Sequence, residues 1–226
     1  SPVMKDMISP MENTVYFLPN SDARQSQIYF YIPMGDYNRE ENVRREAFNQ
    51  YISGGFSGLI MNEIREKNSM AYTAYGFASS RGLPGAQTYF SGYIGTQNDK
   101  AVDAIDLYMK LLTDMPERPG RIDNIKSYLR QSALTDHPDS RNLSLRIAEW
   151  KRRGYTDDPA KEELPLIDSL TFPDIVDYYQ KNIKGKPIII GVLGNPKDIS
   201  IDALKKFGKV IRLNEKKLFN EKDTMF

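Results

Sequence analysis

The stretch that decides the fold runs from residue 71 to residue 96 and reads AYTAYGFASSRGLPGAQTYFSGYIGT. Two strand-like runs, 71–80 and 86–96, flank the turn-forming segment Arg-Gly-Leu-Pro-Gly at 81–85. This arrangement predicts two neighbouring antiparallel strands joined as a β-hairpin. Because successive side chains of a strand point to opposite sides, the residue pattern also predicts what each face of the hairpin carries.

One face of the first predicted strand carries Tyr72, Ala74, Gly76 and Ala78. Three of these four residues are small. A face of this kind can admit a closely packed helix or another stretch of backbone. In the second strand, Phe90 and Ile94 oppose the tyrosines.

Aromatic residues gather on the other face. They are Tyr75 and Phe77 in the first strand, Tyr89 and Tyr93 in the second, and Tyr29 and Tyr31 in an earlier run. The sheet is therefore expected to show water a tyrosine-rich side. Two interpretations stay open, namely ordinary half-buried sheet tyrosines and a surface that faces a ligand.

Further elements are predicted on both sides of this hairpin. Apolar and aromatic runs at 15–18 and 25–34, separated by a turn-prone segment at 19–22, indicate another β-hairpin. Helical spacing predicts helices at 39–53, 58–67, 100–115, 121–133, 140–153, 172–182 and 201–207, the second of them capped by Ser57. The continuous apolar run 187–193 predicts a buried strand and 209–213 a last strand, whereas 135–139 and 156–163 are expected to be polar loops.

The composition limits the chemistry of the chain. Its 226 residues hold 31 Lys+Arg and 30 Asp+Glu, so the net charge of +1 offers no field that would hold nucleic acid or an anionic bilayer. No apolar run approaches the length of about 20 residues that a membrane-spanning helix needs. The sequence contains no cysteine, and His137 is its one histidine. A zinc centre built from histidine and cysteine cannot be assembled from this inventory.

Other catalytic motifs have little support. His137 lies beside acidic residues, but a Ser-His-Asp site also needs a placed nucleophile, and no G-x-S-x-G elbow is present. A solvated loop histidine is the simpler interpretation. The acidic pairs 157–158 and 162–163 fit no calcium loop and are interpreted as charged surface.

No composition shift or flexible linker divides the pattern. We therefore expect residues 1–226 to form a single α+β domain with a mostly antiparallel sheet and helices on one face of it. Because the chain begins at Ser1 without an initiator methionine, we also expect it to be a fragment or subunit of something larger.

Two segments resemble the pitrilysin/insulinase family of metallopeptidases. They are Gly-Gly-Phe-Ser-Gly-Leu at 54–59 and Arg-Glu-Lys-Asn-Ser-Met-Ala-Tyr at 65–72, and the later Thr-Phe-Pro-Asp-Ile at 171–175 and the strand 188–194 are similar to the closing elements of that family. The resemblance spans nearly all the chain, and 65–72 is its most specific stretch.

The resemblance implies a division of labour. In that family, repeated α+β domains enclose a chamber, one domain carries a zinc motif H-x-x-E-H, and a domain of the opposite half offers an Arg and a Tyr to the substrate. Only the second feature matches here, at Arg65 and Tyr72, because one histidine cannot supply two. The chain is thus similar to the non-catalytic, C-terminal type of domain. The resemblance implies that zinc is bound by another domain or subunit.

The chemistry of this pair is reasonable on its own terms. The guanidinium of Arg65 could hold a substrate carbonyl, and the hydroxyl of Tyr72 could donate to an oxygen that gains charge during peptide hydrolysis. The competing interpretation is structural: Arg65 caps its helix or pairs with Glu63 or Glu66, and Tyr72 belongs to the core.

Two functional hypotheses follow. In the first, the chain is the substrate-binding half of a zinc-dependent endopeptidase, inactive alone, whose partners are a peptide and the zinc-bearing domain, and Arg65 and Tyr72 bind the substrate. In the second, it is an inert scaffold or assembly protein of the same fold that uses its tyrosine-rich face. We expect no nucleic-acid partner and no insertion into a membrane, and the resemblance favours the bacterial periplasm or cell envelope.

Overall fold

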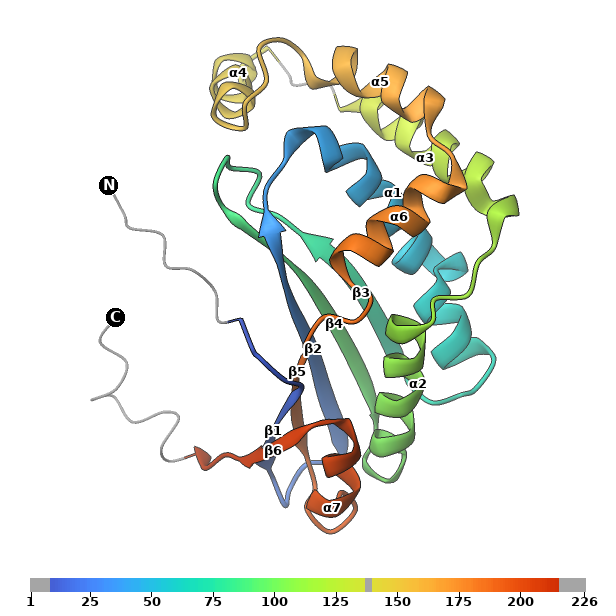
Figure 1. The fold of residues 1–226 in the computed structure, drawn as a ribbon, viewed down its shortest axis with the longest axis vertical. Coiled ribbons are helices and arrows are strands. Elements are labelled where there is room, and N and C mark those ends of the chain that lie inside the picture. The colour runs from blue at the N-terminus through green and yellow to red at the C-terminus, as the bar shows by residue number, and fades with distance from the viewer. Residues whose placement is uncertain (1–8, 137–139, 216–226) are drawn as a thin grey trace, which may run out of the picture.

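The computed structural model of the chain describes residues 9–136 and 140–215. Its centre is a six-stranded sheet with the strand order β3-β4-β2-β5-β1-β6 (Figure 1). The strands are β1 (Thr14–Pro19), β2 (Gln25–Asp36), β3 (Thr73–Ser79), β4 (Gln87–Gln97), β5 (Ile189–Gly194) and β6 (Lys209–Arg212).

The sheet is mostly antiparallel, as the sequence predicts. The pairs β3–β4, β4–β2 and β2–β5 run antiparallel, whereas β1 runs parallel to both β5 and β6. The hairpin expected at 71–96 is confirmed, with Tyr75 opposite Tyr93 in the register.

The hairpin expected from 15–18 and 25–34 is wrong, because β5 lies between β1 and β2 and pairs with both. The connection between them crosses the end of β5, where the Asn20 N–H donates to the Gly194 carbonyl at 2.9 Å. The physical reason is burial: Ile190 and Val192 of β5 are 0% and 2% exposed. A strand this apolar is stabilised most by a place inside the sheet with neighbours on both edges.

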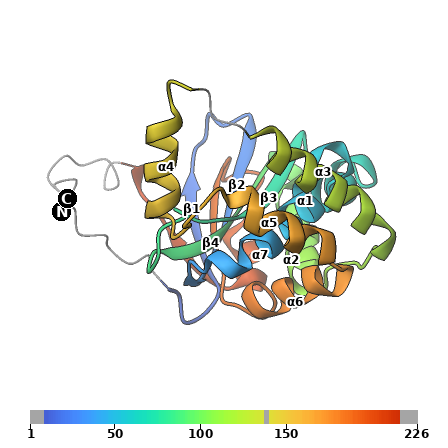
Figure 2. The same cartoon turned by 90° about the horizontal axis from the view of Figure 1, so that it is seen from above.

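The larger helices are α1 (Asn42–Ser53), α2 (Ala101–Thr113), α3 (Ile122–Thr135), α4 (Leu143–Arg152), α5 (Pro159–Ser169), α6 (Phe172–Asn182) and α7 (Ile201–Leu204). α1, α2 and α6 lie on one face of the sheet, and α3 and α5 pack beyond α1 (Figures 1 and 2). The expected α+β class, with helices on one face, is confirmed.

The small-residue face explains how α2 approaches the sheet. Tyr108 of α2 is fully buried, stacks on Phe30 of β2 at 4.0 Å between ring centroids, and donates its hydroxyl to the Tyr75 carbonyl at 3.0 Å. A side chain at Gly76 or Gly92 would collide with this tyrosine. The glycines therefore make room for the ring that locks α2 to the sheet.

Two local predictions need correction. The segment 156–163 is not a loop throughout, since Asp158 caps α5 by accepting from the Ala160 N–H at 2.9 Å and Pro159 opens the helix. Asp followed by Pro is a signal for the start of a helix. The many charged residues of 156–163 favoured a loop instead. Ser57 ends a short 3-10 turn and donates to the Gly54 carbonyl at 3.2 Å rather than capping the next helix. His137 lies outside the described residues.

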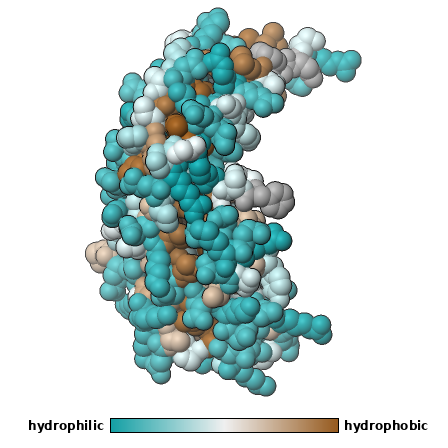
Figure 3. All heavy atoms as spheres, turned by 90° about the vertical axis from the view of Figure 1, so that its right-hand side faces the viewer, coloured by the Kyte–Doolittle hydropathy of each residue, from teal (hydrophilic) through white to brown (hydrophobic). Residues whose placement is uncertain are grey.

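α4 stands apart from the helices that cover the sheet (Figures 1 and 2). None of its residues is buried, and Leu145 is 72% exposed. Seen from the side, the molecule is a crescent that is hollowed along one edge (Figure 3). None of the helices formed by residues 9–136 and 140–215 is long and apolar enough to cross a membrane.

Candidate functional site

Arg65 lies on an unusual turn of helix. Residues Met61–Glu66 form a π-helical turn, in which the Lys67 N–H donates to the Asn62 carbonyl at 3.0 Å. Such turns are rare and are frequent at functional sites, because the extra residue in the turn changes the direction of a side chain. The only non-glycine residue with positive φ in the described chain is Ser69, at φ 51, in the same connection.

One of the two carboxylates that flank Arg65 in the sequence is already occupied by other cations. Glu63 accepts from Lys67 Nζ at 2.9 Å and from Arg118 Nη2, and its side chain is only 15% exposed. Among residues 9–136 and 140–215, Arg65 has one ion pair, a 3.7 Å contact between its Nε and Glu66 Oε1, and its Nη1 also lies 4.0 Å from Met61 Sδ. That pair is exposed on both sides and so contributes little free energy. The guanidinium of Arg65 is thus weakly paired with Glu66, one of the two partners that the structural interpretation expected.

Tyr72 is not a core residue. It is 52% exposed just before β3, with its backbone N–H donating to the Gly95 carbonyl at 2.9 Å. Gln97 Nε2 donates to the Tyr72 hydroxyl oxygen at 3.0 Å, which leaves the phenol hydrogen free. Because Gln97 belongs to the end of β4, this bond fixes Tyr72 at the corner of the sheet.

The fold brings Arg65 and Tyr72 into one connection without joining them. In the described residues no hydrogen bond links the two side chains, and each projects from a backbone held at both ends: Ser69 N–H donates to the Arg65 carbonyl at 2.9 Å, and Met70 N–H to the Ile64 carbonyl at 2.9 Å. A guanidinium and a phenol hydroxyl can each donate a hydrogen bond to an acceptor group.

The face of the sheet opposite the helices carries the expected aromatic residues, aligned in register. One row across the sheet contains Tyr75, Tyr93, Tyr29, Gly191, Tyr16 and Ile211. Its neighbour on one side contains Phe77, Ser91, Tyr31, Ile189, Thr14 and Lys209. On the other side lies a row with Thr73, Gly95, Gln27, Leu193 and Leu18. We call these rows together the open face.

The tyrosines of the open face pack on one another and still reach solvent. Ring centroids are 5.1 Å apart for Tyr29 and Tyr93 and 5.4 Å apart for Tyr75 and Tyr93, and Tyr29 is 51% exposed. Partial burial, followed by the neighbouring Tyr29 and Tyr75, raises the pKa of Tyr93. Its hydroxyl therefore stays neutral near pH 7 and remains a hydrogen-bond donor.

The edge strand β3 is closed by polar side chains of α1. Asn49 Oδ1 accepts from the Ala78 N–H at 2.7 Å, Asn49 Nδ2 donates to the Ala78 carbonyl at 3.0 Å, and Ser53 Oγ accepts from the Gly76 N–H at 2.8 Å. Paired edge groups cannot template another strand. The sequence reasoning missed this role, although two polar residues four positions apart among the apolar residues of α1 are a signal for it.

We expect Asn49→Ala to lower the free energy of unfolding by about 1–2 kcal/mol, because two buried-edge backbone groups lose their partner. The opened edge should also promote self-association at high protein concentration. Chemical denaturation and light scattering measure the two effects. Gln50→Ala, one residue along the same helix, is the control and should change neither, and equal stability of both variants would contradict the role of Asn49.

The described part of the chain offers no group of side chains suited to a metal ion. Within 9–136 and 140–215, no three His, Cys, Asp or Glu side chains gather in a group that could bind a metal ion. With a single histidine and no cysteine in the sequence, this chain does not fit the zinc ion of the metallopeptidases it resembles.

Comparison with known proteins identifies the family of the chain. Residues 8–120 match the family described as the peptidase M16 inactive domain. The chain therefore belongs to the peptidase M16 family, as a non-catalytic domain, and the resemblance to pitrilysin/insulinase metallopeptidases is confirmed. No match was found among curated protein sequences.

Solved structures share the fold. A peptidase M16 inactive domain from Pseudomonas fluorescens aligns with a TM-score of 0.69 at 15% identity, over 86% of this chain and 47% of its own. A protease from Helicobacter pylori aligns with 0.66 at 14% identity, over 86% and 46%. The periplasmic protease PqqL from Escherichia coli aligns with 0.65 at 16% identity, over 86% and 22%. The chain thus spans about half the length of the first two and less of the third.

Proposed function

We propose that this chain is the substrate-holding half of a zinc-dependent endopeptidase, which presents peptides to a zinc site on another domain or subunit. The observation that carries the proposal is that Arg65, whose guanidinium has only a weak, exposed ion pair, and the exposed Tyr72 lie in one connection at the corner of the sheet. Peptide substrate and the zinc-bearing domain are then its partners. The periplasmic PqqL neighbour supports, weakly, a periplasmic or envelope location.

The two side chains have separate tasks in this proposal. Arg65 holds a substrate carbonyl through the fixed donors of its guanidinium. Tyr72 keeps its free hydroxyl hydrogen for the oxygen on which charge develops when the peptide bond is attacked. When bound in the complete enzyme, zinc supplies the polarisation of the scissile carbonyl and of the attacking water.

We expect Arg65→Ala and Tyr72→Phe each to lower kcat/KM of the complete peptidase at least about tenfold, since each removes a donor to the reacting group. Arg81→Ala, an exposed arginine at the other end of β3, is the matched control and should have no effect. Circular dichroism of the variants and the zinc content of the enzyme should be unchanged. Unaltered peptide hydrolysis in both test variants would refute the assignment.

A second candidate function is an inert scaffold of the same fold. The exposure of Tyr29 and Tyr75 favours it, because tyrosine is enriched in protein interfaces. The intact gene and its neighbours distinguish the two functions. A reading frame with H-x-x-E-H, fused or adjacent, supports the peptidase, whereas its absence supports the scaffold.

A further inference from the structure

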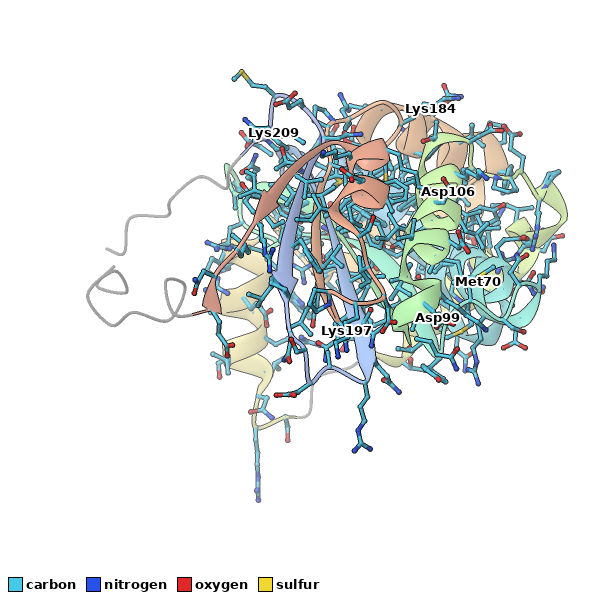
Figure 4. The ribbon with its side chains drawn as sticks, turned by 90° about the horizontal axis from the view of Figure 1, so that it is seen from below. Met70, Asp99, Asp106, Lys184, Lys197 and Lys209 are labelled. Carbon is cyan, nitrogen blue, oxygen red and sulfur yellow. The ribbon has the colours of Figure 1, made fainter. Side chains whose placement is uncertain are left out.

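The open face is unusual in what it lacks. Charged residues make up 27% of the sequence, yet in the three rows of described strand residues the single charged side chain is Lys209. Lys209 belongs to the edge strand β6, on the other side of the molecule from Met70 in the connection that carries Arg65 and Tyr72 (Figure 4). A sheet face that only meets water normally carries charged residues, and their depletion marks the centre of a binding surface.

The open face also contains a notch. Gly191 of β5 lies between Tyr29 on β2 and Tyr16 on β1 in the same row. A Cβ built at Gly191 would meet only Tyr29 Cβ, at 3.8 Å, so the space above the glycine is open. A missing side chain between two tyrosines leaves room for one side chain of a ligand.

The occupant is constrained by the closed edge. An extended peptide usually binds a sheet by adding a strand to its edge. At β3, the edge next to Tyr72, the Gly76 and Ala78 N–H groups are already bonded to Ser53 and Asn49. A peptide that reaches Tyr72 cannot pair with these N–H groups, which favours a position on the face of the sheet, in contact with side chains.

We propose that the open face binds an uncharged, extended segment of the peptide substrate, with one apolar side chain inserted at Gly191 between Tyr29 and Tyr16. This inference rests on the proposed function, and it specifies the class of peptide that the proposed function would handle. Tyrosine rings offer apolar area and neutral hydroxyl donors to such a segment. A carboxylate or ammonium on the segment would lose water here without meeting a counter-ion, so charged segments bind more weakly.

The notch can be filled without breaking the fold. Gly191→Val adds its side chain into open space, and valine favours strands. Gly35→Val is a matched control, because Gly35 lies in β2 outside the three rows and a Cβ there meets nothing within 4 Å. Far-ultraviolet circular dichroism checks that both variants remain folded.

The probe is a short acetylated peptide of Ser, Thr and Ala with Phe at alternate positions, compared with versions that carry Glu or Lys in place of Phe. Titration of the isotope-labelled chain followed by NMR measures even weak binding. We expect the Phe peptide to shift signals of the open face, the Glu and Lys peptides to bind at least tenfold more weakly, and Gly191→Val, but not Gly35→Val, to weaken the Phe peptide at least tenfold.

The outcomes separate this inference from the proposed function. Equal binding of charged and uncharged peptides, or an unchanged affinity in Gly191→Val, overturns the inference while leaving a peptide-binding role in place. No binding of any peptide overturns the inference as well, and the Arg65 and Tyr72 variants then decide the proposed function alone.

Discussion

Gly92→Ala is expected to lower the free energy of unfolding by about 3 kcal/mol, because the site is fully packed and has no space for an added methyl group. The added Cβ would overlap the Tyr108 hydroxyl and lie 2.7 Å from Tyr108 Cζ. Tyr108 cannot move away easily, since it is fully buried, stacked on Phe30 and bonded to the Tyr75 carbonyl. Displacing it would also disturb the backbone that carries Tyr75 onto the open face.

Denaturant unfolding followed by circular dichroism measures the loss. Gly191→Ala is the control, because it adds the same methyl group to a strand of the same sheet, on the open side. It should leave stability unchanged or slightly higher, since alanine suits a strand at least as well as glycine does. Equal midpoints for the two variants would show that the buried face tolerates a Cβ and that the close approach of α2 has been misjudged.

Tyr179→Phe is expected to cost about 2–3 kcal/mol, because it leaves two buried backbone groups without a partner. The Tyr179 hydroxyl donates to the Leu112 carbonyl at 3.1 Å and accepts from the Met115 N–H at 3.3 Å. Tyr179 is 4% exposed, and burial raises the pKa of its hydroxyl, so the group stays protonated and can make both bonds. It ties α6 to the end of α2.

The same unfolding experiment tests this variant. Tyr128→Phe is the matched control, because Tyr128 is 53% exposed and should lose less than about 0.5 kcal/mol. If both tyrosines cost the same, the Tyr179 hydroxyl has no special part in holding α6, and packing of its ring alone holds the contact.

Membership in the peptidase M16 family limits what this chain does by itself. The family match covers residues 8–120, which include the hairpin and the Arg65–Tyr72 connection. The proposed role therefore depends on residues inside the matched part, whereas α3 to α6 and β5 lie outside it. These later elements still shape the proposed binding surface, because β5 contributes Gly191 to the open face.

The sequence by itself determined the local structure. Alternation placed Ala74 and Gly76 on one face of β3 and Tyr75 on the other, because the period of a strand is two residues. Helical periodicity located α1, α2 and α6 for the equivalent reason. Arg65 and Tyr72 were found through the resemblance of 65–72, and no periodic pattern would have singled them out.

Only the tertiary structure decided how these elements meet. β5 takes the place between β1 and β2 because burial of its apolar side chains outweighs the short connection that favours a hairpin. That choice brings Gly191 beside Tyr29, from parts of the chain far apart in sequence. The tertiary fold likewise brings Arg118 to Glu63. Glu63 is therefore occupied, and Arg65 keeps only its weak pair with Glu66. Contacts between distant segments depend on the summed packing of the whole core, which no local pattern contains.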